Sequence, residues 1–145
     1  MLRGRFGATS GQPYIEGLLL IPRLQISADI SLIVDTGADN CVLTPLDGQR
    51  IGVNYAALNT PIESVGFGGI STDFVEPAWL VFSEPKRCLY AYKIGLLIAT
   101  PTPDIQTLPS VLGRDVLDNW RMTYDKPKGR ITFKVLSADM TIPIS

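Results

Sequence analysis

The sequence predicts an all-β, closed, barrel-like domain with one short helix near the C-terminal end. Three observations predict it. Short apolar stretches alternate with turn residues, Gly and Pro number 13 and 11 in 145 residues, and residues 114–120 give the best helical spacing of apolar side chains. Abundant Gly and Pro suit a turn-rich β fold better than a helical one. The length suits one domain, so we expect a flexible N-terminal arm at 1–12 and a single domain at 13–145.

The first half of the chain consists mainly of predicted strands. They lie at 14–24, 25–34, 41–43, 61–65 and 71–75. Pro22 marks an end or an edge of the first strand, because proline cannot donate to a β-ladder. The last two strands flank a glycine-rich tip and form a hairpin. Residues 47–59 are mixed and predict a loop or a helical turn. Asp73 and Glu76, on the second arm of the hairpin, are expected to be solvated.

The second half predicts further strands around one helix. The strands lie at 79–82, 89–98, 111–113, 121–124 and 130–136, and the last two form a hairpin. Two prolines make 100–108 a loop. In the tail at 137–145, alternating apolar residues leave a terminal strand possible, although Pro143 cannot donate to a ladder.

The composition of the chain excludes several classes of function. A net charge of −1 implies no polyanion, so no nucleic-acid partner is predicted. The longest apolar run, 94–99, is too short to cross a bilayer, and residues 1–12 lack the apolar core of a signal peptide. We therefore expect no membrane partner and a cytoplasmic location. The chain has no histidine, which excludes Ser-His and Cys-His catalysis and zinc sites that need imidazole.

The two cysteines, Cys41 and Cys88, allow two interpretations. They could form one disulfide. Alternatively, they are small apolar side chains in the core of a protein from a reducing compartment, and this is the interpretation that we favour.

An apolar strand runs directly into the acidic turn Asp35-Thr36-Gly37. Because the residues before Asp35 show no polar alternation, we expect a strand buried on both faces. A carboxylate in such a place is costly unless it has a use. The tripeptide alone is a weak motif, and its other interpretation is a polar turn in which Asp35 caps backbone N–H groups.

Two further motifs follow in a fixed order. A glycine-rich tip spans residues 64–71, and the segment Val111-Leu112-Gly113-Arg114 closes an apolar strand. No Gly-Lys-Ser or Gly-Lys-Thr follows the glycines, which argues against a phosphate cradle. The three motifs together resemble the retropepsin-like aspartic proteases, the single-domain family that includes the retroviral proteases. The resemblance spans about residues 13–135.

The resemblance implies roles for individual residues. The catalytic turn is Asp35, Thr36 and Gly37. Substrate contacts fall to Ala38 and Asp39 and to the glycine-rich tip, which acts as a flap over the substrate: Gly66, Phe67, Gly68, Gly69 and Ile70. Structural support comes from Val111, Leu112, Gly113 and Arg114, with a bidentate pair between Arg114 and Asp39. No metal or cofactor is implied.

The chain contains a single Asp-Thr-Gly, and one copy cannot build a pair of aspartates. A catalytic dyad therefore requires a homodimer, with Asp35 from each subunit meeting at a two-fold axis. We expect an aspartic endopeptidase acting on extended polypeptides. Two alternatives remain open: a catalytically silent module for peptide binding or assembly, and a β-barrel that matches by chance. In the last case, Asp35 and strand 111–113 would not be adjacent.

Overall fold

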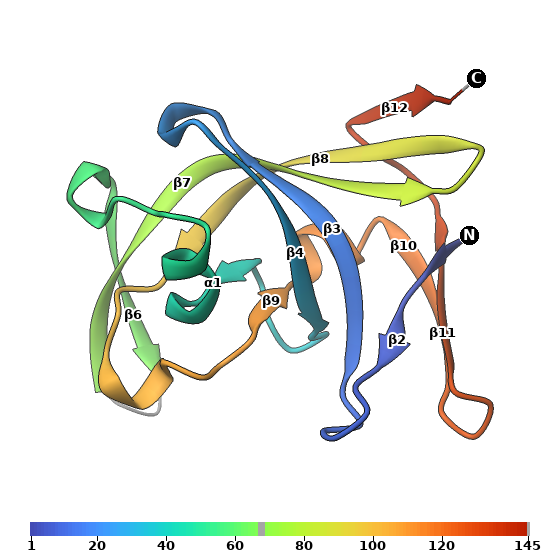
Figure 1. Ribbon diagram of the computed structural model, residues 1–145, viewed down its shortest axis with the longest axis horizontal. Coiled ribbons are helices and arrows are strands. Elements are labelled where there is room, and N and C mark those ends of the chain that lie inside the picture. Colours follow the sequence, from blue (N-terminus) through green and yellow to red (C-terminus); the bar gives the residue numbers. More distant parts are fainter. Residues whose placement is uncertain (67–68, 145) are drawn as a thin grey trace.

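The computed structural model describes residues 1–66 and 69–144, and it leaves out the side chains of residues 64–71. Figure 1 shows the arrangement of the elements. The strands are β1 (Leu2–Arg3), β2 (Arg5–Phe6), β3 (Pro13–Ile21), β4 (Ile26–Val34), β5 (Val42–Leu43), β6 (Pro61–Gly66), β7 (Gly69–Glu84), β8 (Cys88–Ile98), β9 (Ser110–Leu112), β10 (Trp120–Asp125), β11 (Arg130–Val135) and β12 (Met140–Pro143). The helices are α1 (Pro45–Arg50) and α2 (Arg114–Leu117), with 3-10 turns η1 (Pro22–Leu24), η2 (Tyr55–Ala57) and η3 (Pro103–Ile105).

The larger sheet closes on itself. Its strands follow the order β8-β5-β9-β4-β3-β7, and β7 pairs back onto β8, so the ring has no open edge. Antiparallel pairs dominate, but β4 runs parallel to β9 and β5 runs parallel to β8. A second sheet, β1-β11-β10, lies beside the barrel (Figure 1). The predicted all-β barrel is confirmed. In the part of the chain described, no helix has the length and apolar character needed to span a membrane.

Aromatic side chains join the small sheet to the barrel. The Trp120 ring lies 4.9 Å from that of Phe82 and 5.0 Å from that of Phe133, measured between centroids. Trp120 Nε1 donates to the Tyr92 hydroxyl at 2.7 Å, and that hydroxyl donates to the Ser137 carbonyl at 2.8 Å. The polar atoms of Trp120 and Tyr92 are thus hydrogen-bonded inside an apolar core.

The predicted helix at 114–120 is shorter than expected. α2 ends at Leu117, and Trp120 already begins β10. The Asn119 carbonyl accepts hydrogen bonds from the backbone N–H groups of Leu136 and Ser137, at 2.8 and 3.2 Å. Pairing with the C-terminal end of β11 therefore ends the helix, and burial of Trp120 in the aromatic cluster holds the chain there.

The region predicted as strands 71–75 and 79–82 is one long strand, β7. Pro77 lies opposite Gly95 of β8. On the other side of β7 it falls between the stretch that pairs with β6 and the stretch that pairs with β3, so its missing N–H interrupts neither of those two ladders. Glu76 was expected to be solvated, and this is wrong, since it is 1% exposed. Arg23 of η1 covers it and donates to both carboxylate oxygens, at 2.9 and 2.5 Å, and to the Ala57 carbonyl.

The N-terminal segment differs from the expected flexible arm. β1 pairs with β11, placing Leu2 opposite Phe133, and β2 pairs with β3. Leu2 is 1% exposed and belongs to the core. The strands are two residues long, too short for their alternation to be visible in the sequence.

We predict that Leu2→Ala lowers the free energy of unfolding by about 2–4 kcal/mol, because it leaves a cavity beneath β1. Leu46→Ala, at a side chain that is 50% exposed, serves as the control and should change it by less than about 0.5 kcal/mol. Urea unfolding monitored by tryptophan fluorescence measures both. If both substitutions have equal, negligible effects, residues 1–12 form the flexible arm that the sequence predicts.

Candidate active site

The acidic turn sits where two parallel strands end side by side. β4 pairs in parallel with β9, with Val34 opposite Leu112. The Asp35 backbone N–H then donates to the Leu112 carbonyl at 3.1 Å, and the Ala38 N–H closes the turn on the Asp35 carbonyl at 3.2 Å. Asp35 and β9 are therefore adjacent, which contradicts the chance-match alternative.

The Asp35 carboxylate is exposed, as are Thr36 and Gly37. Its Oδ1 accepts a hydrogen bond from the Gly37 backbone N–H at 2.9 Å. The capping interaction is therefore present, but it uses only one of the two oxygens. A Cβ on residue 37 would lie 3.2 Å from Oδ1, so glycine suits this close approach. No salt bridge among the described residues involves Asp35.

Arg114 connects the acidic turn to α2. Its Nη2 donates to Asp39 Oδ1, and its Nη1 donates to the Thr36 carbonyl at 3.4 Å. The contact thus bridges a carboxylate and a carbonyl, and it is not the expected bidentate fork. Since Arg114 and Asp39 are 44% and 79% exposed, the pair adds little stability. A firmer connection is the 2.8 Å hydrogen bond from the Arg114 backbone N–H to the Ala38 carbonyl.

Gly113 allows the turn and β9 to pack in contact. A Cβ at this position would lie 2.4 Å from the carbonyl carbon of Asn40 and 2.5 Å from its oxygen. The requirement is one of space and not of backbone conformation, because φ is −97°. On the N-terminal side of Gly113, Leu112 is fully buried and Val111 pairs with both Ile33 and Val42. Val111, Leu112 and Gly113 thus lie directly behind the turn, and their role as its structural support stays a prediction.

Two residues that hold the turn had no role in the sequence prediction. Asp115 Oδ2 accepts from the Cys41 backbone N–H at 3.0 Å, and its Oδ1 accepts from the Cys41 thiol and from the Val116 N–H, each at 3.0 Å. Burial, and after it the Asp115 charge, raises the pKa of the Cys41 thiol, so the thiol keeps the proton that it donates. The position of Asp115 directly after Gly113-Arg114 was the available signal. Cys41 and Cys88 are both free and buried.

Two residues of the predicted flap, Phe67 and Gly68, lie outside the residues that the structure describes. In the described backbone, Gly66 pairs with Gly69 at the end of the β6–β7 hairpin, and Val65 pairs with Ile70. The second arm of this hairpin is tied to the barrel, since the Thr100 hydroxyl donates to the Thr72 carbonyl at 2.6 Å.

We predict that Gly113→Ala lowers the free energy of unfolding by about 2–3 kcal/mol and displaces the acidic turn, because the neighbouring atoms are backbone and cannot rotate away. Gly95→Ala is the control, since the Cβ there would meet one Val75 methyl at 3.2 Å. Thermal unfolding and amide NMR shifts of residues 35–41 would show the difference. If Gly113→Ala proves as mild as its control, the close approach has no structural importance.

Comparison with known proteins gives a structural match without a sequence match. No family model and no curated protein sequence matches the chain. The crystal structure of a retropepsin-like aspartic protease from Rickettsia conorii superposes with a TM-score of 0.58 at 20% identity, covering 97% of this chain and 92% of that one. EIAV protease complexed with the inhibitor HBY-793 matches with a TM-score of 0.43 at 20% identity, covering 77% and 90%. From the first of these matches, the chain has the retropepsin-like fold.

Proposed function

We propose that the protein is an aspartic endopeptidase that hydrolyses extended polypeptides as a homodimer, with one Asp35 from each subunit. The observation that supports this most is the placement of Asp35. Its carboxylate is exposed where two parallel strands end in the buried residues Val34 and Leu112. It is held by one backbone hydrogen bond and engaged in no salt bridge in the described part of the chain.

The chemistry follows from two carboxylates that share one proton. At about 3 Å, two negative charges repel by roughly 5 kcal/mol at an effective dielectric of 20, so the pair retains a proton. The ionised carboxylate takes a proton from water, whose oxygen attacks the peptide carbonyl carbon. The protonated carboxyl gives its proton to the carbonyl oxygen. When the tetrahedral intermediate collapses, the carboxyl that took the proton from water gives it to the nitrogen. A hydroxyl of the intermediate returns its proton to the other carboxylate, and the C–N bond breaks.

A second subunit supplies the second carboxylate. Within one chain, the other acidic group of the turn, Asp39, already forms a salt bridge with Arg114. The strands β10 and β12 stand at the ends of the described strand orders, so each offers an outer edge to a second copy.

The substrate would lie between the acidic turn and the β6–β7 hairpin. An extended peptide bound there as an added strand gains main-chain hydrogen bonds, and alternate side chains enter pockets. Ala38 and Asp39 from the turn, and residues 66–70 from the flap, are the proposed contacts. Closure of the hairpin would exclude water from the reacting groups.

We predict that Asp35→Asn lowers peptide cleavage by more than about 1000-fold while the fold is kept, because Asn can still accept the Gly37 hydrogen bond. Asp118→Asn makes the same change at an exposed position after α2 and should leave cleavage intact. Digestion of a peptide library at several pH values measures the cleavage by wild type and by both variants.

Two results of this digestion would contradict the proposal. Equal cleavage by wild type and Asp35→Asn would place the activity elsewhere. Binding of peptides without cleavage by the wild type at any pH would identify the protein as the silent binding module.

We also predict that specific activity depends on enzyme concentration. Below the dimer dissociation constant, activity should rise with the square of the concentration, and above it in proportion. Sedimentation in the same buffer should place the monomer–dimer transition at the same concentration. A protein that is fully active while it sediments as a monomer would contradict the dimer.

A further inference from the structure

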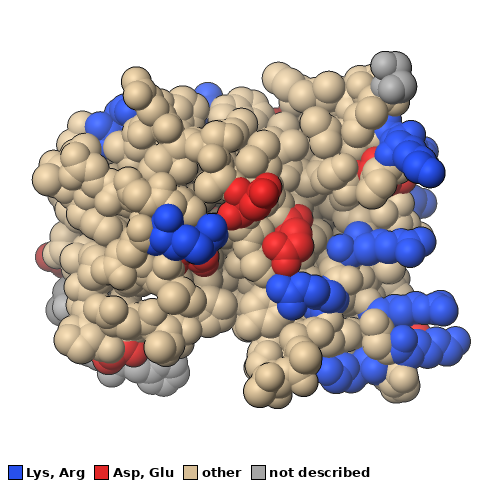
Figure 2. Space-filling view, in the orientation of Figure 1, with Lys and Arg blue, Asp and Glu red and all other residues tan. Residues whose placement is uncertain are grey.

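The small sheet β1-β11-β10 carries a local excess of positive charge. Residues 120–135 contain five Lys or Arg residues and one carboxylate, although the net charge of the whole chain is −1. Figure 2 shows Lys and Arg side chains gathered along the side of the molecule where β1 and β11 lie in Figure 1.

The strand register places three of these cations, together with Arg3 of β1, on one outward face. Arg121 lies opposite Lys134 in the β10–β11 pair, and Asp125 lies opposite Arg130. Between these two rows, Thr132 is flanked by Thr123 and by Arg3 of β1. The other face of the sheet is core, with Leu2, Ile131 and Phe133 buried. We call the outward set Arg3, Arg121, Arg130 and Lys134 the cationic face.

The four cations of this face form no salt bridge among the described residues, although Asp125 lies on the same face opposite Arg130. Five arginines of the chain form salt bridges with carboxylates: Arg5, Arg23, Arg50, Arg87 and Arg114. The remaining three, among the described residues, are Arg3, Arg121 and Arg130, and all of them belong to the cationic face. All four members of this face are exposed. An arginine fork without a partner is suited to a carboxylate from another molecule.

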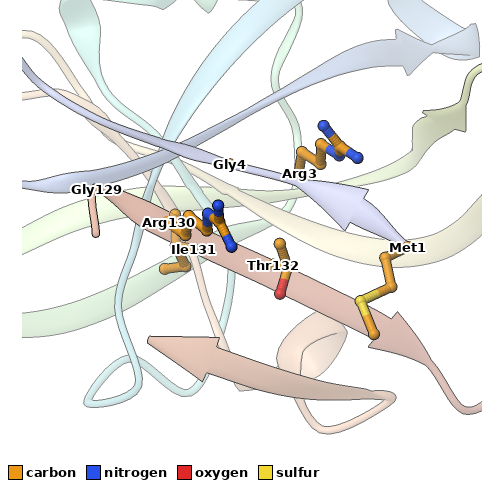
Figure 3. A pocket seen from close by; sticks show the side chains of 7 residues that line it. All are labelled: Met1, Arg3, Gly4, Gly129, Arg130, Ile131 and Thr132. Carbon is orange, nitrogen blue, oxygen red and sulfur yellow. The ribbon is translucent and has the colours of Figure 1, made fainter. Parts of the chain in front are cut away.

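The surface is hollowed between β1 and β11. Met1, Arg3, Gly4, Gly129, Arg130, Ile131 and Thr132 line this hollow. Figure 3 shows Arg3 and Arg130 on the two strands, with the Thr132 hydroxyl on β11 beyond Arg130. Gly4 and Gly129 contribute no side chain, so an anionic group can approach the guanidinium groups closely.

We propose that the cationic face binds an acidic segment of an extended polypeptide and acts as an accessory site for substrates that carry such a segment. This role as a substrate site rests on the proposed protease function. Alternate side chains of an extended chain recur about every 6.4–6.8 Å, which is also the spacing of residues 130, 132 and 134 along β11. Alternating Glu or Asp residues therefore match the rows of the face.

Other partners fit the face less well. A second copy of the same face would repel it, because both are positive. Nucleic-acid single strands bind through aromatic stacking, and membranes through inserted apolar side chains, but the outward residues of β10 and β11 are charged residues and threonines. The exposed Met122 and Tyr124 alternate with these residues and point to the opposite face of the sheet.

The test measures binding without catalysis. A fluorescein-labelled octaglutamate peptide is titrated with the Asp35→Asn protein, and fluorescence anisotropy is recorded at about 50 and 300 mM salt. We expect saturable binding that salt weakens, and a loss of about 5- to 10-fold in affinity for Arg130→Glu and for Lys134→Glu. Lys93→Glu on β8 makes the same change in net charge outside the face and should alter affinity less than about twofold.

Each other outcome overturns the proposal. Absence of binding at low salt, or equal losses for Lys93→Glu and Arg130→Glu, would show that the face is no specific site. Tighter binding of a single-stranded oligonucleotide or of phosphatidylserine vesicles, lost in the same variants, would assign the face to those partners. Since anisotropy does not depend on turnover, its result is separate from that of the cleavage assay.

In active enzyme, the same variants should raise KM for a substrate with an added acidic segment and leave kcat unchanged. They should leave both constants unchanged for the untailed substrate. An equal loss on both substrates would mean that the substitutions damage the active site or the fold, and the accessory role would be wrong.

Discussion

The parallel pairing of β4 with β9 is the constraint on which the rest of the structure depends. It joins Leu32–Val34 to Ser110–Leu112 in the barrel, with Val34 opposite Leu112, and it ends both strands at the same level. The acidic turn is then held in place, because the Asp35 backbone N–H is hydrogen-bonded to the Leu112 carbonyl and Gly113 packs directly on Asn40. An exposed carboxylate is thereby presented on a rigid support, which is what catalysis by a positioned acid and base requires.

Much of the fold could be predicted because its strands are apolar runs bounded by turn residues. The errors occur where distant contacts override local pattern. Trp120 fits helical spacing, but burial beside Phe82 and Tyr92 makes it the first residue of β10. Glu76 is charged, as most surface residues are, and only its contact with Arg23, which is distant in the sequence, explains its burial. The two-residue strand β1 has no readable pattern, since Leu2 is identified as core only by its pairing with β11.

The candidate site could be assembled from the order of three motifs, and the structure brings two of them, around Asp35 and Gly113, into contact. What the sequence did not reveal is how the turn is held. The Cys41 thiol donates a hydrogen bond to Asp115, and nothing in the sequence around Cys41 predicts this role. Likewise, a net charge of −1 averages over the chain and hides the unpaired arginines on one sheet.

The central claim is that each subunit supplies one Asp35 to a shared site, and mixing subunits tests it most directly. Wild-type protein is equilibrated with a ninefold excess of Asp35→Asn protein at a concentration where dimers dominate. Random pairing then leaves about one wild-type subunit in ten with a wild-type partner, so activity per wild-type subunit should fall about tenfold. Activity per wild-type subunit that stays constant as the inactive variant is added would contradict the account.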